Sequence, residues 1–234
     1  MIARGVDAIA VPLIEIALPL DPEPVRDAWA GLGARGLAVF VSSNAVARFF
    51  AARSAGAAWP EGLLAAAPGP GTAESLRTQG VPAAAIVAPA ADAPQLDSES
   101  LWQQLQQHDW HGRSVLVVRG DGGRDWLVER LVEAGAQVDA VAAYRRLAPR
   151  LSAEERHHVA AAFAAPARHA WLFSSSEAVG HLEALDGVSI AVGSRALATH
   201  PRIAARARQA GFDAVFEVQP GLDAVVACIQ SMQP

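Results

Sequence analysis

One stretch, VLVVRGDGGRDWLVERLVEAGAQVDAVAAYRR from Val115 to Arg146, constrains the fold of this chain more than any other. It opens with the apolar run Val115–Val118, which is short enough for a buried strand. A glycine-rich turn follows, and apolar side chains then recur at helical spacing until Gly135, which is placed to end a helix. Val138–Tyr144 has the character of a second strand. The stretch predicts a strand–turn–helix–strand unit whose turn leaves N–H groups free to bind an anion.

Strands and helices alternate along the rest of the chain as well, which predicts an α/β protein with parallel sheets. The strands that we expect outside this unit are Ala8–Val11, Gly36–Val41, Leu63–Ala67, Ala84–Ala88, Ala170–Phe173, Val188–Val192 and Ala214–Val218. The helices that we expect there are Val25–Leu32, Ala45–Ala55, Ala73–Gln79, Ser98–Gln107, Ala153–Ala164, Arg195–Ala210 (mostly helical, with a restart near Pro201) and Leu222–Met232.

Two extended segments marked by proline, near Pro12–Pro19 and Tyr144–Pro149, indicate that the chain passes twice between two domains. We therefore expect a discontinuous α/β domain formed by residues 1–14 and 150–234. Residues 15–19 and 144–149 would be linker strands, and residues 20–143 an inserted α/β domain.

The two expected domains contain similar sequence segments. FVSSNAV at residues 40–46 resembles FSSSEAV at residues 173–179, an offset of 133 residues. Further along each half, a predicted strand, a glycine turn and a helix follow, with Ala67-Pro-Gly69 in the first half and Ala191-Val-Gly193 in the second. Two related halves explain both pairs. The alternative is that strand–serine–helix corners look alike in any α/β protein.

Several predicted strand–helix corners share short polar side chains and glycines that favour anion binding. They are Ser42–Asn44, Gly69–Thr72, Gly120–Arg124 and Ser174–Glu177, with Gly193–Arg195 as a fifth. Such corners gather at the carboxyl ends of parallel strands, where ligands bind. If the halves face each other, the corners line one cleft that suits a ligand with several carboxylates. The alternative is that each serine or asparagine only caps its helix.

Tyr144 is the only tyrosine of the chain and lies where a predicted strand meets the second linker. A phenol there can donate its proton to a leaving hydroxyl or a carboxylate; the alternative is a half-buried aromatic side chain at a sheet edge. Arg119 and Arg124 bracket the glycine turn. Each can bind a carboxylate through two hydrogen bonds or remain a solvated surface charge.

Composition excludes several classes of function. The net charge of −5 argues against a general nucleic-acid or membrane-surface binder. All 19 basic residues are arginine, so a Walker A motif and a Schiff-base lysine are absent. Cys228 is the only cysteine, which excludes a disulfide within the chain and fits a reducing cytoplasm. Apolar runs of transmembrane length and a signal-peptide pattern are lacking. The histidine pairs lack partners at metal-ligand spacing, so we expect no metal site.

Taken together, VRGDGGRDWL, AYRR, FVSSNAVARFF, PGPGTAESL, FSSSEAVGHL and THPRIAARARQAGF resemble, in order and spacing, the motifs of the uroporphyrinogen-III synthase family. The resemblance implies two α/β domains joined by a two-strand ladder, with the active site in the cleft. It implies that the linear tetrapyrrole polycarboxylate hydroxymethylbilane is cyclised with loss of water and inversion of ring D, in haem biosynthesis. It also implies a cytoplasmic enzyme that needs no cofactor or metal; we expect a monomer.

The resemblance assigns Tyr144 as the acid that helps the hydroxyl to leave. Together with the corners and the two arginines, it predicts these substrate-binding residues: Ser42, Ser43, Asn44, Gly69, Thr72, Arg119, Gly122, Gly123, Arg124, Ser174, Ser175, Ser176, Gly193 and Ser194. A non-catalytic two-lobed polycarboxylate-binding protein is the alternative, because it would use the same corners without Tyr144.

Two departures from the family pattern stand out. Ala196 occupies a position where the family often has a threonine, so we expect Ser194 to replace it or the contact to be missing. The family also begins with a strand and a helix before the segment that matches Arg4–Ile16. We therefore expect that the natural start lies upstream or that the first domain is impaired.

Overall fold

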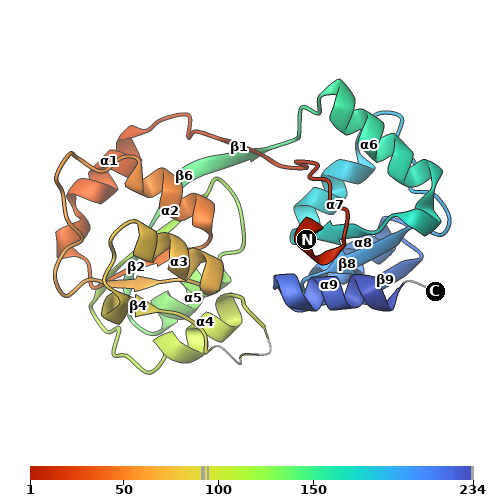
Figure 1. Cartoon of the computed structure of the whole chain (residues 1–234). Coiled ribbons are helices and arrows are strands. Elements are labelled where there is room, and N and C mark those ends of the chain that lie inside the picture. The colour runs from red at the N-terminus through yellow and green to blue at the C-terminus, as the bar shows by residue number, and fades with distance from the viewer. Residues whose placement is uncertain (91–92, 94, 233–234) are drawn as a thin grey trace. The chain divides into compact units, whose positions relative to one another are not determined.

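In the computed structural model, which describes residues 1–90, 93 and 95–232, the chain forms two compact units. One combines Met1–Glu15 with Leu147–Pro234, and the other is Ile16–Arg146 (Figure 1). The first passage between them lies in β1 (Glu15–Ala17) and the second at the end of β6 (Gln137–Leu147). These two strands are neighbours in one sheet.

The sheet of the Ile16–Arg146 unit has the strand order β1-β6-β5-β2-β3-β4. Its further strands are β2 (Leu37–Phe40), β3 (Leu64–Ala66), β4 (Ile86–Val87) and β5 (Ser114–Gly120). The five strands from β6 to β4 pair in parallel. Their carboxyl ends therefore share one edge of the sheet, and the chain segments that leave those ends lie side by side there.

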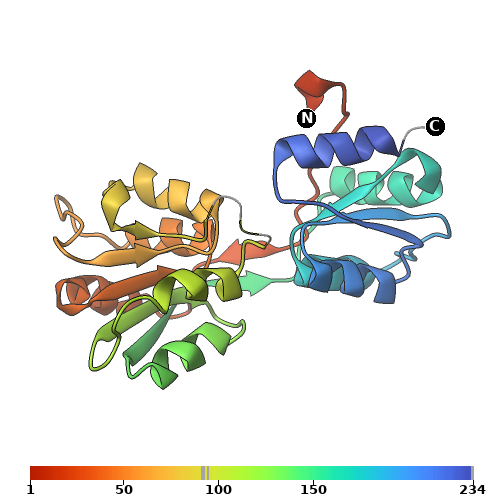
Figure 2. The ribbon, with the colours of Figure 1, turned by 90° about the horizontal axis from the view of Figure 1, so that it is seen from below.

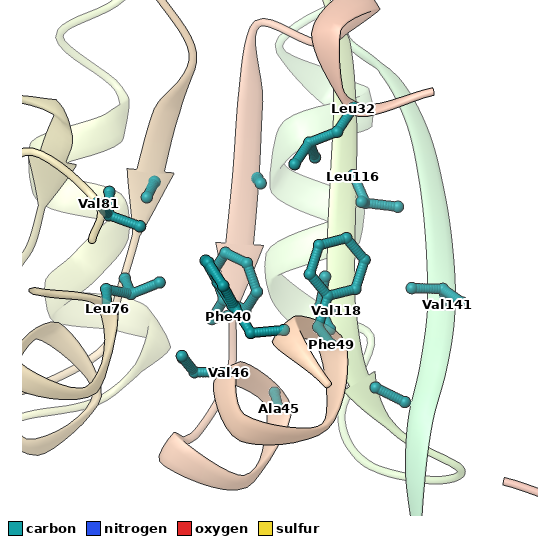
Figure 3. Close-up of a cluster of buried hydrophobic side chains, with 14 of the residues drawn as sticks. Leu32, Phe40, Ala45, Val46, Phe49, Leu76, Val81, Leu116, Val118 and Val141 are labelled. Carbon is teal, nitrogen blue, oxygen red and sulfur yellow. The ribbon is translucent and has the colours of Figure 1, made fainter. Parts of the chain in front are cut away.

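Helices cover both faces of this sheet (Figure 2). On one face, α1 (Glu23–Ala30), α2 (Ser43–Phe50) and α3 (Pro70–Thr78) pack on the side chains of Phe40 and Val118, as Figure 3 shows for α2 and its neighbours. On the other face, α4 (Ser98–Leu105) and α5 (Trp126–Glu133) pack on alternate residues of the same strands, such as Val39 and Val117. Burial on both faces explains why these strands are continuously apolar in the sequence.

The other unit has a parallel three-stranded sheet in the order β7-β8-β9. Its strands are β7 (Trp171–Phe173), β8 (Arg195–Ala198) and β9 (Ala214–Glu217). Its helices are α6 (Ala153–Ala164), α7 (Ser176–Glu183), α8 (Pro201–Gln209) and α9 (Leu222–Ser231). Short 3₁₀ helices complete the two units: Ile2–Arg4, Leu32–Ala34, Ala83–Ala85 and Pro166–Arg168. The alternation of strands and helices with parallel sheets confirms the predicted α/β class.

The predicted strand Val188–Val192 and the start of the predicted helix at Arg195 are wrong. Residues 188–192 form a loop whose Val188 and Ile190 side chains pack on the core, and β8 begins only at Arg195. Alanine favours helices, which made Arg195–Ala198 look helical. Pairing with β7 on one side and β9 on the other overrides that local preference.

The predicted strand Ala8–Val11 is also absent, because residues 6–13 carry no regular element. Val11 and Leu13 nevertheless pack into the core of the unit built on β7, β8 and β9. These apolar side chains thus contact a core without forming a strand, because Pro12 limits the backbone hydrogen bonds that a strand would need.

Candidate functional site

Tyr144 lies near the end of β6, and its side chain is buried, with 3% of its surface exposed. The interpretation as a half-buried aromatic side chain at a sheet edge is therefore wrong. β1 is the edge strand, and β6 lies inside it. The phenol oxygen of Tyr144 lies 3.1 Å from Oγ of Ser42. Because Ser42 is itself half-buried, the phenol oxygen lies at the margin of the core rather than deep within it.

A register shift in β6 places Tyr144 on this face of the sheet. Arg119 pairs with Ala142, whereas the next residue, Gly120, pairs with Tyr144, so that Ala143 is an extra residue in the strand. Along a regular strand, neighbouring side chains point to opposite faces. The bulge allows Ala143 and Tyr144 to join the same core, on the side of α2.

Gly120 makes room for the aromatic ring. The sheet order places β5 between β6, which carries Tyr144, and β2, which leads to Ser42. A Cβ atom on Gly120 would lie 3.0 Å from Cε2 and 3.1 Å from Cζ of Tyr144. The ring therefore reaches Ser42 by passing over a residue that has no side chain.

Ser42 also begins α2. Its backbone is extended, and its Oγ accepts the N–H of Ala45 at 3.2 Å, which is the usual bond of an N-cap serine. Ser43 and Asn44 follow in the first turn with exposed side chains. Within the described residues, their N–H groups have no assigned acceptor. Such groups at a helix N-terminus suit a carboxylate.

The next corner, between β3 and α3, presents a second helix N-terminus. Gly69 is the N-cap residue and contributes no capping side chain, and Pro70 opens the helix. The N–H groups of Gly71 and Thr72 have no assigned acceptor in the part of the chain that the structure describes. Thr72 is largely buried, whereas Gly71 lies close enough to Ser43 that an added Cβ would meet its Oγ at 3.9 Å. The two corners are thus neighbours.

The glycine turn after β5 provides the third corner. Residues 121–125 are all exposed, and Gly123 has a φ of 131°, which favours glycine. For Gly122 and Gly123, too, no acceptor is assigned to the N–H group among residues 1–90, 93 and 95–232. The turn is tied to β6 because Asp121 donates its N–H to the carbonyl of Tyr144 at 3.0 Å.

Both predicted arginines already contact carboxylates of the protein. Arg119 pairs with Asp125, the N-cap residue of α5. Arg124 donates two hydrogen bonds to Glu99, at 2.5 and 3.1 Å. The hydrogen bond to Glu99 raises the pKa of Arg124, so the guanidinium stays fully charged. Any external carboxylate must compete with these partners.

In the other unit, Ser174 and Ser175 follow β7, and Ser176 opens α7. Ser175 caps α7 by accepting the N–H of Glu177 at 3.2 Å. The 133-residue offset maps Ser42 onto Ser175, and the two serines have the same capping role.

Gly193 and Ser194 do not lie at the carboxyl end of a strand. They precede β8, so they lie at the opposite end of that strand from the corner that leads to α8. Ala196 is buried inside β8, so the comparison with a family threonine concerned the wrong end of the strand. The misplaced strand at residues 188–192 caused both errors.

Sequence reasoning missed Thr199 and His200, which form the true corner after β8. Thr199 donates its N–H to the carbonyl of Phe173 at 3.1 Å, and Nδ1 of His200 accepts the N–H of Arg202 at 3.1 Å. Pro201 is the first residue of α8 and was the available signal, because proline favours the first turn of a helix.

A cavity of about 660 Å³ lies in the same unit as β7, next to α6. Its lining includes Leu151, Phe163 and Val188, and none of the predicted site residues. Among the described residues, no three His, Cys, Asp or Glu side chains are grouped so that they could hold a metal ion.

In the described part of the chain, no helix has both the length and the apolar character that crossing a membrane requires.

The chain matches known proteins over nearly its whole length. A family model described as uroporphyrinogen-III synthase HemD matches residues 1–227. Among solved structures, a mutant uroporphyrinogen III synthase from the extremely thermophilic bacterium Thermus thermophilus has a TM-score of 0.59 and 19% identity, over 96% of this chain and 88% of that one. The uroporphyrinogen-III synthetase of Helicobacter pylori has a TM-score of 0.56 and 16% identity, over 97% and 96%. The structural likenesses show a shared fold, and the family match shows that this chain belongs to the uroporphyrinogen-III synthase family.

Proposed function

We propose that this protein converts the linear tetrapyrrole hydroxymethylbilane into uroporphyrinogen III, with Tyr144 as the acid that helps the hydroxyl to leave. Family membership supports the reaction. The observation that supports the role of Tyr144 is its place: the single phenol of the chain lies over Gly120 and 3.1 Å from Ser42, beside corners at which, among the described residues, backbone N–H groups have no assigned acceptor. The reaction makes the protein a lyase of porphyrin and haem biosynthesis.

The chemistry needs an acid and a positioning surface rather than a strong nucleophile. The phenol proton moves to the hydroxyl oxygen of the substrate, the carbon–oxygen bond breaks and water leaves. When the macrocycle closes with ring D inverted, the pyrrole carbon that forms the new bond loses a proton, which returns to the phenolate. Protons therefore balance, and one water molecule is the only by-product.

The substrate is a flexible polyacid, so that holding it in a reactive geometry lowers the entropic part of the barrier. We assign that task in the Ile16–Arg146 unit to the corners at Ser42–Asn44, Gly69–Thr72 and Gly122–Arg124. The N–H groups of the first two corners lie at the N-termini of α2 and α3, where the helix dipole favours negative charge, whereas those of Gly122 and Gly123 belong to the turn that precedes α5. In the other unit, Ser174, Ser175 and Ser176 remain the predicted carboxylate contacts.

Product analysis tests the proposal. Freshly generated hydroxymethylbilane is supplied to the protein, the product is oxidised, and the uroporphyrin isomers are separated. An excess of the type III isomer over the type I isomer that forms spontaneously supports the proposed reaction. Formation of type I alone, at the rate of a protein-free control, would contradict it and would favour a protein that only binds polycarboxylates. We expect the active form to be a cytoplasmic monomer.

A further inference from the structure

We propose that Ser42 is the positioning residue of Tyr144: it donates its hydroxyl proton to the phenol oxygen and so leaves the phenol proton directed at the substrate. This inference rests on the proposed function and deepens it. It changes the role of Ser42 from a carboxylate contact to a partner of the acid.

The contacts of Ser42 support this direction of the hydrogen bond. Its Oγ already accepts the N–H of Ala45 at 3.2 Å, and the phenol oxygen of Tyr144 lies 3.1 Å away. A serine hydroxyl has one proton to donate. If Ser42 donates it to Tyr144, the N–H of α2, the Ser42 hydroxyl and the phenol form one directed chain, and the phenol proton stays available for the substrate.

The surroundings of Tyr144 leave its hydroxyl few alternatives. The side chain is 3% exposed, the bulge at Ala143 sets its direction, and Gly120 lies directly beneath the ring. The ring position is therefore decided by packing, whereas rotation of the hydroxyl about its bond to the ring is not. Among the described residues, Ser42 is the side chain that forms an assigned hydrogen bond with this oxygen.

The same contact favours the transition state. As the phenol proton moves to the leaving hydroxyl, negative charge develops on the phenol oxygen. A hydrogen bond to a charged oxygen is stronger than one to a neutral oxygen, so the donor at Ser42 stabilises the transition state more than the ground state. The N–H of Ala45 polarises the Ser42 hydroxyl further in the same direction.

Three variants at Ser42 and Tyr144 separate this role from helix capping. Ser42→Gly removes the hydroxyl but keeps most of the capping stability, because glycine is an acceptable N-cap. Ser42→Thr keeps both the hydroxyl and the cap. The double variant Ser42→Gly with Tyr144→Phe asks whether Ser42 acts through the phenol. Ser152→Gly, at the N-cap of α6, is the matched control for loss of a capping serine elsewhere.

We expect Ser42→Gly to lower kcat for type III formation about tenfold with little change in KM, Ser42→Thr to restore kcat, and Ser152→Gly to leave it unchanged. In the Tyr144→Phe background, Ser42→Gly should cost nothing further. An unchanged kcat in Ser42→Gly, or an equal loss in the Phe background, overturns the proposal. If the wild-type protein forms no type III isomer, the proposed function fails first; coupling of the two substitutions in the free energy of unfolding then still decides whether the hydrogen bond exists.

Discussion

The phenol oxygen of Tyr144 and the hydroxyl oxygen of Ser42 lie 3.1 Å apart although 102 positions separate the two residues in the sequence. Tyr144 belongs to β6, Ser42 follows β2, and β5 lies between these strands. The ring spans the intervening strand at Gly120, where a side chain would block it. One hydrogen bond therefore depends on a bulge in β6, a glycine in β5 and a helix cap that follows β2.

Tyr144→Phe should reduce kcat for type III formation by at least about tenfold, because a general acid usually contributes a factor of roughly 10² to 10⁴. KM should stay nearly unchanged, since the proposed carboxylate contacts are backbone N–H groups that the substitution does not touch. Steady-state kinetics with separation of the isomers measures both. A normal kcat in this variant would remove Tyr144 from the mechanism while leaving the family assignment intact.

Gly120→Ala should destabilise the protein by about 1–3 kcal/mol and lower kcat, because the new methyl group would press on a buried ring that cannot move without leaving Ser42. Chemical unfolding and turnover measure the two effects. Gly33→Ala is the control, since no atom lies within 4 Å of its added Cβ and its φ is not positive. Equal stability of the two variants would contradict this prediction, because it would show that the Tyr144 ring can shift away from the added methyl group at little cost.

Glu99→Gln should lower KM by a factor of about five or less, because it releases Arg124 from an exposed ion pair worth under about 1 kcal/mol. Arg124→Gln should raise KM if the guanidinium binds a substrate carboxylate. Arg26→Gln, which breaks a comparable exposed pair with Glu23, serves as the control. If KM is the same in all three variants, Arg124 only joins the turn to α4.

Glu155→Gln should make Tm depend less on pH in the acid range. The backbone N–H of Ser152, with its side chain, lowers the pKa of Glu155 below the ordinary 4.5. Because the pKa of Glu155 is lower in the folded state than in the unfolded state, the carboxylate stabilises the folded protein at pH values above the unfolded-state pKa. This stabilisation is lost as the pH falls through the folded-state pKa. Wild type and variant should thus differ in Tm at neutral pH and converge in acid. Glu154→Gln removes a charge from the same turn without the Ser152 bond and should change the profile less; an equal change would contradict the assignment.

Local signals were sufficient for many elements. The expected helix Ala153–Ala164 has the bounds that the structure shows, because its capping box, Ser152 with Glu155, marks the start within four residues. Strand β8 could not be recognised in this way. Its four residues, RALA, carry no strand signal of their own, and they form a strand because β7 and β9 supply hydrogen-bond partners on both sides.

The same distinction holds for the site. Residues that are adjacent in the sequence determine the Ser42 cap, the glycine turn and the helix after that turn. The corners at Ser42, Gly69 and Gly122 could therefore be predicted. The pairing of Arg124 with Glu99, 25 positions away, gives no local signal. The error at Gly193 and Ser194 likewise followed from a strand whose position depends on its neighbours.

By itself, the sequence determined the α/β class, the order of most elements, several strand–helix corners and the family, because these depend on periodicity, caps and turns that act within a few residues. The tertiary structure decided where the single tyrosine points. A one-residue bulge at Ala143 reverses the face on which Tyr144 would otherwise lie, and only the packing of β6 against β5 shows where that extra residue is accommodated.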